Sequence, residues 1–365
     1  MKWEDVLPST TIGLEQQSVY EKVILLGKKL EMQGSLTSKE FLFIFNHITD
    51  ELQQVFSKRA HTITVEQFGK KIYGRALIEI TNYCKNNCFY CGIRASNLHA
   101  KRYRLTKEEI LSSAQLGYEN GLRTFVLQGG EDYAFTDDLL VEILIAIKEQ
   151  YPDCAITLSL GERSQESYKK LRNAGADRYL LRHETITNEH YGQLHPQEMS
   201  LANRVNCLYH LKNLQYQVGT GIMVGTPQQT VQHIADDMEF ICRFRPQMVG
   251  VGPFLPHKDT PFGKQKKGDL KLTLLIISLL RLMDKQLLIP STTALATLDS
   301  SGRRLGILAG ANVIMPNVSP SEVREKYMLY NDKVRVGEGE LEAELQEMGY
   351  TMTVARGDNW SQSTF

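Results

Sequence analysis

Three cysteines lie within eight residues of one another, at Cys84, Cys88 and Cys91. Thiolates this close in the sequence can converge on one metal centre, and three protein ligands leave a fourth position open. A structural zinc site needs four protein ligands, and His99 could complete a Cys₃His set. An iron–sulfur cluster is also held by thiolates, and a missing fourth cysteine would leave one iron free to bind a small molecule. The spacing therefore predicts a metal centre and leaves both metals open.

The other three cysteines, Cys154, Cys207 and Cys242, are scattered among apolar neighbours. A free cysteine behaves as a small hydrophobic residue, so we interpret these three as core residues. Six cysteines in a chain of 365 residues are too few for a disulfide scaffold.

Polar and glycine-rich residues follow eight short apolar segments. They are residues 82–84, 128–132, 159–162, 182–185, 223–226, 252–257, 291–293 and 315–317. Such residues at the carboxyl ends of parallel strands form the active site in barrel enzymes. Loops are polar in any protein, but ionisable residues so close to apolar strands favour a functional site. The pattern indicates an enzyme.

The elements that must position these residues alternate along the chain. The apolar segments predict strands over 76–81, 123–128, 155–160, 178–182, 218–224, 248–254, 288–293 and 312–315. Amphipathic segments predict helices over 107–120, 137–149, 165–174, 201–214, 230–244, 270–285 and 303–309. Eight strands alternating with helices indicate an α/β fold with a parallel sheet, closed as a complete (β/α)8 TIM-type barrel. An open doubly wound sheet is the alternative.

Three parts are expected along the chain: an N-terminal helical segment over 1–70, the barrel over 71–318, and a C-terminal extension packed on it over 319–365. In the first part, residues 15–30 carry apolar residues at helical spacing. Thr37 and Glu40 form a capping box that opens a second helix, and Thr106 and Glu109 form another after the cysteines.

The composition excludes several functions. Lys plus Arg and Asp plus Glu both total 42, so the net charge is zero, which disfavours nucleic-acid binding and attachment to anionic membranes. The longest apolar run, residues 272–283, is too short to span a bilayer. The N-terminus has acidic residues where a secretory signal would be apolar, so we expect a cytoplasmic protein.

The cysteine motif resembles a known signature. The stretch Cys84-Lys-Asn-Asn-Cys88-Phe-Tyr-Cys91 is similar to the CxxxCxxC motif of radical S-adenosylmethionine (SAM) enzymes. Within that superfamily, the chain from about residue 70 to 330 resembles the HydE-type [FeFe]-hydrogenase maturases, relatives of biotin synthase and methylornithine synthase. The later motifs that carry this resemblance are residues 101–104, 127–132, 157–162, 176–185, 250–257, 292–294 and 310–317.

The resemblance implies cofactors and residues that hold them. It implies one [4Fe–4S] cluster, held by the three cysteines, whose open iron binds SAM. An electron from the reduced cluster breaks SAM into methionine and a 5′-deoxyadenosyl radical. Ser159, Arg182, Glu184 and Arg204 are the residues expected to hold SAM. Arg182 and Glu184 alternate on one predicted strand and should face the same side. A structural ion pair at the barrel rim is the alternative for Arg182 and Glu184.

The resemblance also implies a substrate site, a substrate and partners. The substrate site should be lined by Gln128, Thr157, Thr292, Thr293, Met315, Tyr327 and Tyr330, although several of these could be ordinary core residues. His257 could be a ligand or a loop hydrogen-bonder. The substrate would be an iron carbonyl–cyanide–cysteine complex delivered by a partner maturase. An electron donor of the flavodoxin or ferredoxin type would reduce the cluster.

Two departures leave room for other functions. No cysteine follows Cys242, whereas some family members carry three C-terminal cysteines that bind a second cluster. Gly129 and Gly130 stand where relatives can have Ser-Gly. A radical SAM enzyme acting on a small organic substrate, as a mutase or in sulfur chemistry, is the second hypothesis. A non-enzymatic zinc or electron-transfer protein is the third.

Overall fold

Six consecutive parallel strands form the central sheet of the computed structural model, which describes residue 3 and residues 18–334 and 339–359. The strands pair in chain order: β2 (Ala76–Thr81), β3 (Thr124–Gly129), β4 (Ala155–Ser159), β5 (Arg178–Leu180), β6 (Gln217–Val224) and β7 (Met248–Pro253). In this register Gln128 lies beside both Glu79 and Ser159. The first six predicted strands are therefore confirmed, with ends shifted by one or two residues.

The two remaining predicted strands are shorter than expected. Residues 288–293 are not a strand, which corrects that prediction. Leu288 and Pro290 make only isolated bridges, to Met248 and Val313. Pro290 has no N–H to donate to a ladder, and Thr292 already caps the next helix. The last predicted strand is β8 (Val313–Ile314), which pairs with β1 (Lys71–Gly74) in a separate three-stranded sheet. The strand pairing thus shows a six-stranded parallel sheet, and not the complete barrel predicted.

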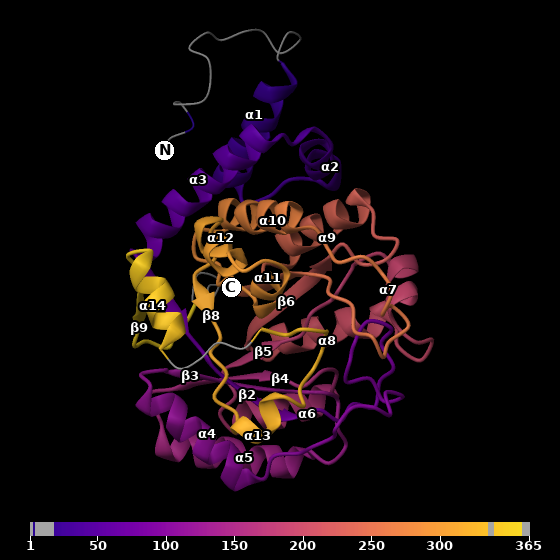
Figure 1. The fold of residues 1–365 in the computed structure, drawn as a ribbon, viewed down its shortest axis with the longest axis vertical. Coiled ribbons are helices and arrows are strands. Elements are labelled where there is room, and N and C mark those ends of the chain that lie inside the picture. Colours follow the sequence, from indigo (N-terminus) through magenta and orange to yellow (C-terminus); the bar gives the residue numbers. More distant parts are fainter. Residues whose placement is uncertain (1–2, 4–17, 335–338, 360–365) are drawn as a thin grey trace.

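Amphipathic helices cover the outer face of the sheet (Figure 1). They are α4 (Lys107–Glu119), α5 (Asp137–Gln150), α6 (Gln165–Asn173), α8 (Leu201–Asn213), α9 (Val231–Phe244) and α10 (Leu270–Met283). Each follows one strand of the sheet, as predicted, and α12 (Gly302–Leu308) is the last predicted helix. The Thr106 capping box is present at the start of α4. None of the described helices is both long and apolar enough to cross a membrane.

Three N-terminal helices pack on α9 and α10 (Figure 1). They are α1 (Val19–Gln33), α2 (Ser38–His47) and α3 (Asp50–Phe68), and the predicted Thr37–Glu40 capping box opens α2. Their buried residues, such as Phe41 and Phe56, share one hydrophobic cluster with residues of α9, α10, β6 and β7. Residues 15–17 of the predicted first helix lie outside the described residues.

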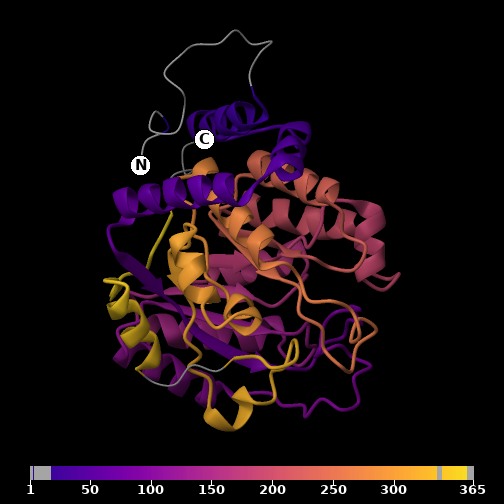
Figure 2. The same ribbon diagram turned by 45° about the horizontal axis from the view of Figure 1, so that its top comes forward.

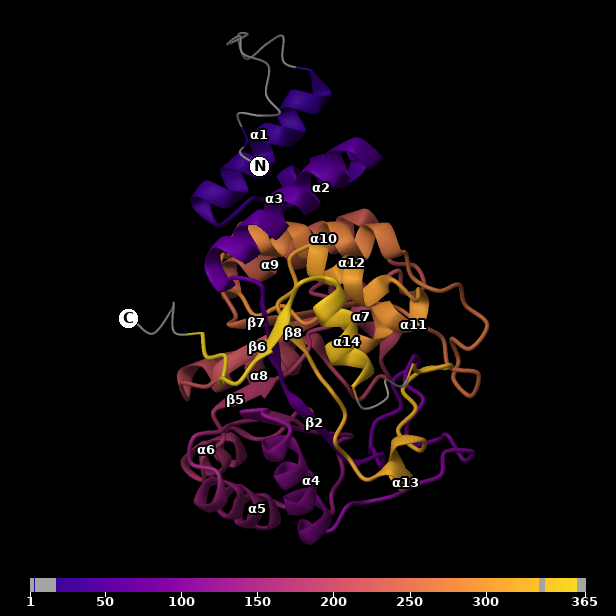
Figure 3. The ribbon, with the colours of Figure 1, turned by 60° about the vertical axis from the view of Figure 1, so that its left-hand side comes forward.

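The C-terminal part, yellow in Figure 3, returns alongside the chain's first strand. After α13 (Ser321–Arg324) and α14 (Glu340–Glu347), β9 (Thr351–Thr353) pairs with β1 in parallel. Two further helices, α7 (Asn188–Leu194) and α11 (Thr293–Leu298), were not predicted because each has only six or seven residues. So short a segment gives little helical periodicity to read.

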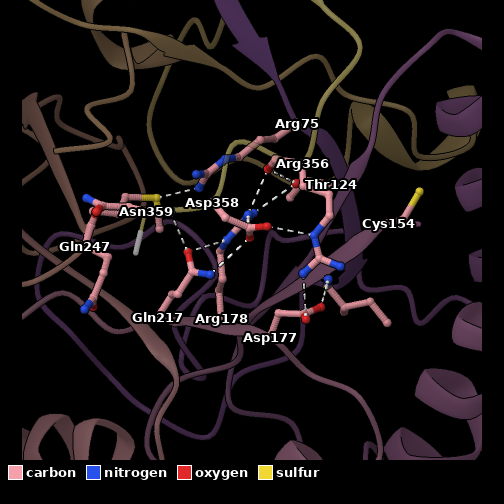
Figure 4. A network of polar contacts seen from close by, with 12 residues as sticks. Arg75, Thr124, Cys154, Asp177, Arg178, Gln217, Gln247, Arg356, Asp358 and Asn359 are labelled. Atoms are coloured by element: carbon pink, nitrogen blue, oxygen red, sulfur yellow. Dashed lines mark hydrogen bonds and ion pairs between the residues drawn. The ribbon is translucent and has the colours of Figure 1, made fainter. Parts of the chain in front are cut away.

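A polar network closes the amino ends of the strands (Figure 4). Arg178, the first residue of β5, is fully buried and donates to Asp358 Oδ1 (2.5 Å) and Thr124 Oγ1 (2.9 Å). Arg356 pairs with Asp177, and the backbone N–H of Asn359 donates to Gln217. Residues 356–359 therefore lie across the end of the sheet opposite the cysteines.

Candidate functional site

The cysteine loop, residues 82–105, follows β2 at the carboxyl end of the sheet. It is held by backbone bonds to other loops, including Phe89 N to Leu194 O (2.9 Å) and Gly92 N to Leu329 O (2.9 Å). Arg102 lies inside the loop and donates to the carbonyl oxygens of Asn82, Ile93, Arg94 and Asn97. One guanidinium thus joins four carbonyl oxygens of a segment that has no regular structure.

The three thiols lie together on this loop, free and half-buried. Burial raises the pKa of Cys91 to about 12, and burial together with the neighbouring thiols raises the pKa of Cys88 well above its usual value. The loop by itself therefore disfavours three thiolates. A cationic centre would reverse this preference, because thiolates are the form that binds metals.

Two glycines let other backbones approach the cysteines closely. A Cβ on Gly130 would lie 2.2 Å from the carbonyl oxygen of Tyr83 and 2.6 Å from Cys84 Cβ. A Cβ on Gly92 would lie 2.1 Å from the carbonyl oxygen of Met328. Side chains at these positions would push the β3 loop and the C-terminal part away from the cysteines.

Two observations bear on the zinc alternative. Among the described residues, no three His, Cys, Asp or Glu side chains converge closely enough to hold a single metal ion. His99 is exposed, and its backbone N–H bonds to Asn97 Oδ1. A [4Fe–4S] cluster places its irons apart, so its cysteines need not meet at one point. His257 is a loop hydrogen-bonder, because its Nδ1 accepts from the backbone N–H of Asp259 (3.2 Å).

Ionic side chains meet beside the cysteines where β4 and β5 end. Arg182 Nη2 lies 3.1 Å from Glu184 Oε2. Arg204, on α8, donates to Glu162 Oε1 (2.5 Å) and to the carbonyl oxygen of Arg182 (2.8 Å). Three of the predicted SAM residues, Arg182, Glu184 and Arg204, are thus brought together. Glu162 belongs with them and was not predicted.

Glu184 is not in a strand, which corrects the argument that placed it beside Arg182. Its φ is +65°, a left-handed conformation that a non-glycine residue rarely adopts. The turn is supported from behind by Asp237 of α9, which accepts from the Ile186 N–H (2.5 Å) and lies 3.5 Å from His183 Nε2. Burial raises the pKa of Asp237, although His183 opposes the shift. A turn held in this way positions one carboxylate at the rim.

Several polar atoms at this end of the sheet remain unsatisfied. Within the described chain, no hydrogen-bond partner reaches Thr157 Oγ1 or Arg182 Nε, although both atoms are buried. Arg182 Nη2 and Glu184 Oε2 have only each other, as an ion pair at 3.1 Å without a hydrogen bond. Buried polar groups without partners are rare in native proteins and call for an explanation such as a bound ligand. These atoms could bind the amino, carboxylate and hydroxyl groups of a zwitterionic cofactor.

The predicted substrate residues fall into separate groups. Gln128 Nε2 donates to Tyr327 Oη (3.3 Å), and Gln128 also lies beside Ser159, one of the predicted SAM residues. Met315 and Thr293 line a cavity of about 410 Å³ between β8 and the C-terminal part, together with Asn317 and Lys333.

The other predicted substrate residues are partly used in the fold. Thr292 caps α11, since its Oγ1 accepts from the Leu295 N–H. Tyr330 bonds to Thr297 and has a pKa raised by burial. The structure therefore does not gather all seven residues around one space.

A buried carboxylate that the sequence reasoning missed lies next to Gln128. Glu79, in β2, accepts from Asn317 Nδ2 (2.8 Å) and Lys333 Nζ (2.5 Å). Lys333 also lies 5.0 Å from the Tyr327 ring centroid. The signal for Glu79 in the sequence was its charge inside an otherwise apolar strand. Its partners, Asn317 and Lys333, come from the opposite end of the chain, so the sequence gave no signal for these contacts.

Comparisons with known proteins agree with this geometry. Residues 78–241 match the model of the radical SAM superfamily. The chain is 46% identical to the [FeFe] hydrogenase maturase subunit HydE of Thermotoga maritima over 77% of this chain and 80% of that protein. It is 30% identical to 3-methylornithine synthase of Methanosarcina barkeri, over 87% of this chain and 89% of that protein.

Solved structures are also similar. A crystal structure of methylornithine synthase (PylB) superposes with a TM-score of 0.79 and 26% identity, covering 90% of this chain and 97% of that one. A structure of the maturase HydG has a TM-score of 0.79 and 19% identity, covering 93% of this chain and 78% of that one, which bears on the fold alone.

Proposed function

Because the chain belongs to the radical SAM superfamily, in the group of the [FeFe]-hydrogenase maturase HydE, we propose that it cleaves SAM reductively and acts in hydrogenase maturation. The observation that carries this proposal is the adjacency of three free thiols to the buried ion pair of Arg182 and Glu184, whose Arg182 Nε has no partner in the described chain, at one end of a parallel sheet. The arrangement offers a cluster site and a zwitterion site side by side.

Cys84, Cys88 and Cys91 would hold a [4Fe–4S] cluster, and Ser159, Arg182, Glu184 and Arg204 would hold SAM. When bound, the cluster supplies the electron that cleaves SAM to methionine and a 5′-deoxyadenosyl radical. Glu184 and Thr157 offer acceptors for the amine and hydroxyl groups of SAM, while Arg182 and Arg204 offer cations for its carboxylate. Glu162 keeps Arg204 in place by a contact of 2.5 Å.

The substrate would lie below SAM, near Gln128, Thr157 and Tyr327, with Thr292, Thr293, Met315 and Tyr330 farther along the C-terminal part. The resemblance to HydE favours an iron carbonyl–cyanide–cysteine precursor delivered by a partner maturase, and a flavodoxin- or ferredoxin-type donor. Glu79 and Lys333 would add a charged pair to this site. We also propose a cytoplasmic location, since HydE-type chemistry requires reduced iron–sulfur proteins.

A second candidate function is favoured by the similarity to 3-methylornithine synthase, which extends over 87% of the chain. In that case the same radical would rearrange a small amino acid. Glu79 and Arg182 could then pair with the charged groups of such a substrate. The third hypothesis, a zinc or electron-transfer protein, leaves the unsatisfied side chains without a role.

We further propose that the sheet closes into a complete ring of eight. The two isolated bridges of Leu288 and Pro290 would supply the seventh position. Residues 313–318 would supply the eighth, because Leu77 N donates to Pro316 O and Val318 N donates to Leu77 O, both at 2.9 Å. The segments 1–70, 71–318 and 319–365 would then be a helical cover, the barrel and an extension.

The experiment that tests the proposed function is anaerobic reconstitution with iron and sulfide, followed by reduction and electron paramagnetic resonance with and without SAM. We expect a reduced-cluster signal that changes when SAM is added, together with 5′-deoxyadenosine in the product mixture. Deoxyadenosine together with 3-methylornithine in the product mixture would favour the second candidate. Stoichiometric tetrahedral zinc without a cluster would refute both.

A further inference from the structure

The loop that joins β7 to α10 carries an uneven charge. The lysine loop, residues 255–268, holds four lysines (Lys258, Lys264, Lys266 and Lys267) against one aspartate, which leaves a net charge of +3 in a chain whose net charge is zero. All four lysines are exposed. Within the described chain, no ion pair or hydrogen bond joins their ammonium groups to another residue.

Two acidic residues lie in or directly after this loop. Asp259 is already counted in the net charge of +3, and Asp269 caps α10 by accepting from the Leu272 N–H (2.6 Å). Within the described chain, neither forms an ion pair with one of the four lysines. Lys101, in the cysteine loop itself, is exposed as well. Exposed lysines therefore lie on both loops.

The lysine loop is fixed directly to the cysteine loop. Its Phe262 N–H donates to the carbonyl oxygen of Phe89 (3.3 Å), and the two rings are 6.1 Å apart. Phe262 also packs with Tyr90 on a buried cluster that includes Phe254. Figures 1 and 2 both show the orange loop after β7 beside the purple cysteine loop. The apolar anchor faces inward, so the lysines of the same loop face solvent next to the cysteines.

From this placement we propose that the lysine loop is the docking surface for a small acidic protein that carries one electron. The proposal rests on the proposed function, which requires reduction of a cluster on the neighbouring loop. In this step the carrier loses one electron and the cluster gains it, and no bond forms or breaks. A surface of one sign next to the redox centre attracts a partner of opposite charge and shortens the path of the electron.

The charge of the lysine loop also makes docking depend on the salt concentration. Complementary charges raise the association rate of two proteins by roughly 10- to 1,000-fold, and salt weakens this effect. Because the lysines are exposed, their attraction is screened beyond about 10 Å at 0.1 M salt. The loop should therefore change the concentration of carrier that the enzyme needs, while leaving the chemistry after electron transfer unchanged.

The test is a triple charge reversal, Lys264→Glu, Lys266→Glu and Lys267→Glu, in the reconstituted full-length protein. Deoxyadenosine formation is measured at increasing concentrations of reduced flavodoxin, an acidic one-electron carrier, and separately with dithionite, a small chemical reductant. The matched control reverses Lys22, Lys39 and Lys58, which are exposed on the three N-terminal helices. Both triple variants carry the same change in net charge.

We expect the loop variant to need at least about tenfold more flavodoxin for half-maximal cleavage at low salt, with the difference shrinking as salt is raised. Its iron content and its rate with dithionite should match the parent. An unchanged flavodoxin requirement, or an equal shift in the control variant, would overturn the docking proposal alone. Parent protein that fails to cleave SAM even with dithionite would overturn the proposed function and this proposal with it.

Discussion

Removing the Asp358 carboxylate should destabilise the protein, because it leaves the Arg178 guanidinium buried without its counterion. Arg178 is 1% exposed, and Asp358 is its ionic partner at 2.5 Å. Breaking a buried ion pair from one side costs about 3–5 kcal/mol. The Asp358 side chain is 16% exposed, so water can partly replace it, and we expect the lower end for Asp358→Ala. With an unfolding entropy of about 2.1 cal/mol/K per residue, 3 kcal/mol corresponds to a fall in Tm of about 4 °C.

The assay is thermal unfolding of the protein by circular dichroism, with Asp358→Asn as the control that keeps shape and an acceptor oxygen. The double variant Arg178→Met, Asp358→Ala should lose less stability than the two single losses added, since the unpaired cation is gone. Arg178 also holds the pKa of Asp358 below its usual range, against the effect of burial. The stabilisation is therefore present above about pH 4 and is lost as the pH falls through that lowered pKa. A Tm within 1 °C of the parent for Asp358→Ala, or strictly additive losses, would refute this reasoning.

Three further outcomes are expected. Cys88→Ala should abolish SAM cleavage, while the core variant Cys154→Ala keeps it. By Mössbauer spectroscopy, the parent protein should bind about four irons and no more. Arg204→Ala should weaken SAM binding by roughly 10- to 100-fold in an equilibrium binding measurement, as expected for the loss of a charge-assisted hydrogen bond. Glu184→Gln should lower the yield of deoxyadenosine while the cluster spectrum stays intact. Burial and the Arg204 cation lower the pKa of His195 to about 3. The unfolded chain therefore binds a proton that the folded chain does not, so the free energy of unfolding should fall by about 1.4 kcal/mol per pH unit below pH 6.5. His195→Gln should remove that part of the pH dependence in urea titrations.

The parts of the fold that could be predicted are those with a local signal. The capping boxes at Thr37 and Thr106 each involve one hydroxyl and one carboxylate three residues apart, and both are present. The six strands of the sheet are short apolar runs between amphipathic helices. The prediction failed at residues 288–293, where an apolar run contains Pro290 and ends in a helix cap. Apolar character alone does not distinguish a ladder strand from a buried connection.

The candidate site likewise contains residues that could be predicted from a local signal and residues that could not. The cysteines are close in sequence, so their proximity could be predicted, and the grouping of Arg182, Glu184 and Arg204 was implied by resemblance. The left-handed turn at Glu184 could not be predicted, because its supports come from distant elements: Gly221 in β6 accepts from the Glu184 N–H, and Asp237 in α9 accepts from the Ile186 N–H. Arg102 belongs to the motif of residues 101–104, but its role could not be predicted, since its four carbonyl partners belong to a loop without regular structure.

A row of polar side chains crosses the first three strands of the sheet, and this placement follows from the register of the strands. Glu79, Gln128 and Ser159 lie side by side across β2, β3 and β4. The sequence shows each of them as a single polar residue near the end of an apolar run, and only the register shows that they are neighbours. Parallel strands bring their carboxyl ends to one edge, where the loops of a barrel enzyme form its active site. Because Gln128 and Ser159 lie close to the carboxyl ends of β3 and β4, this row leads toward the edge that carries the cysteine loop.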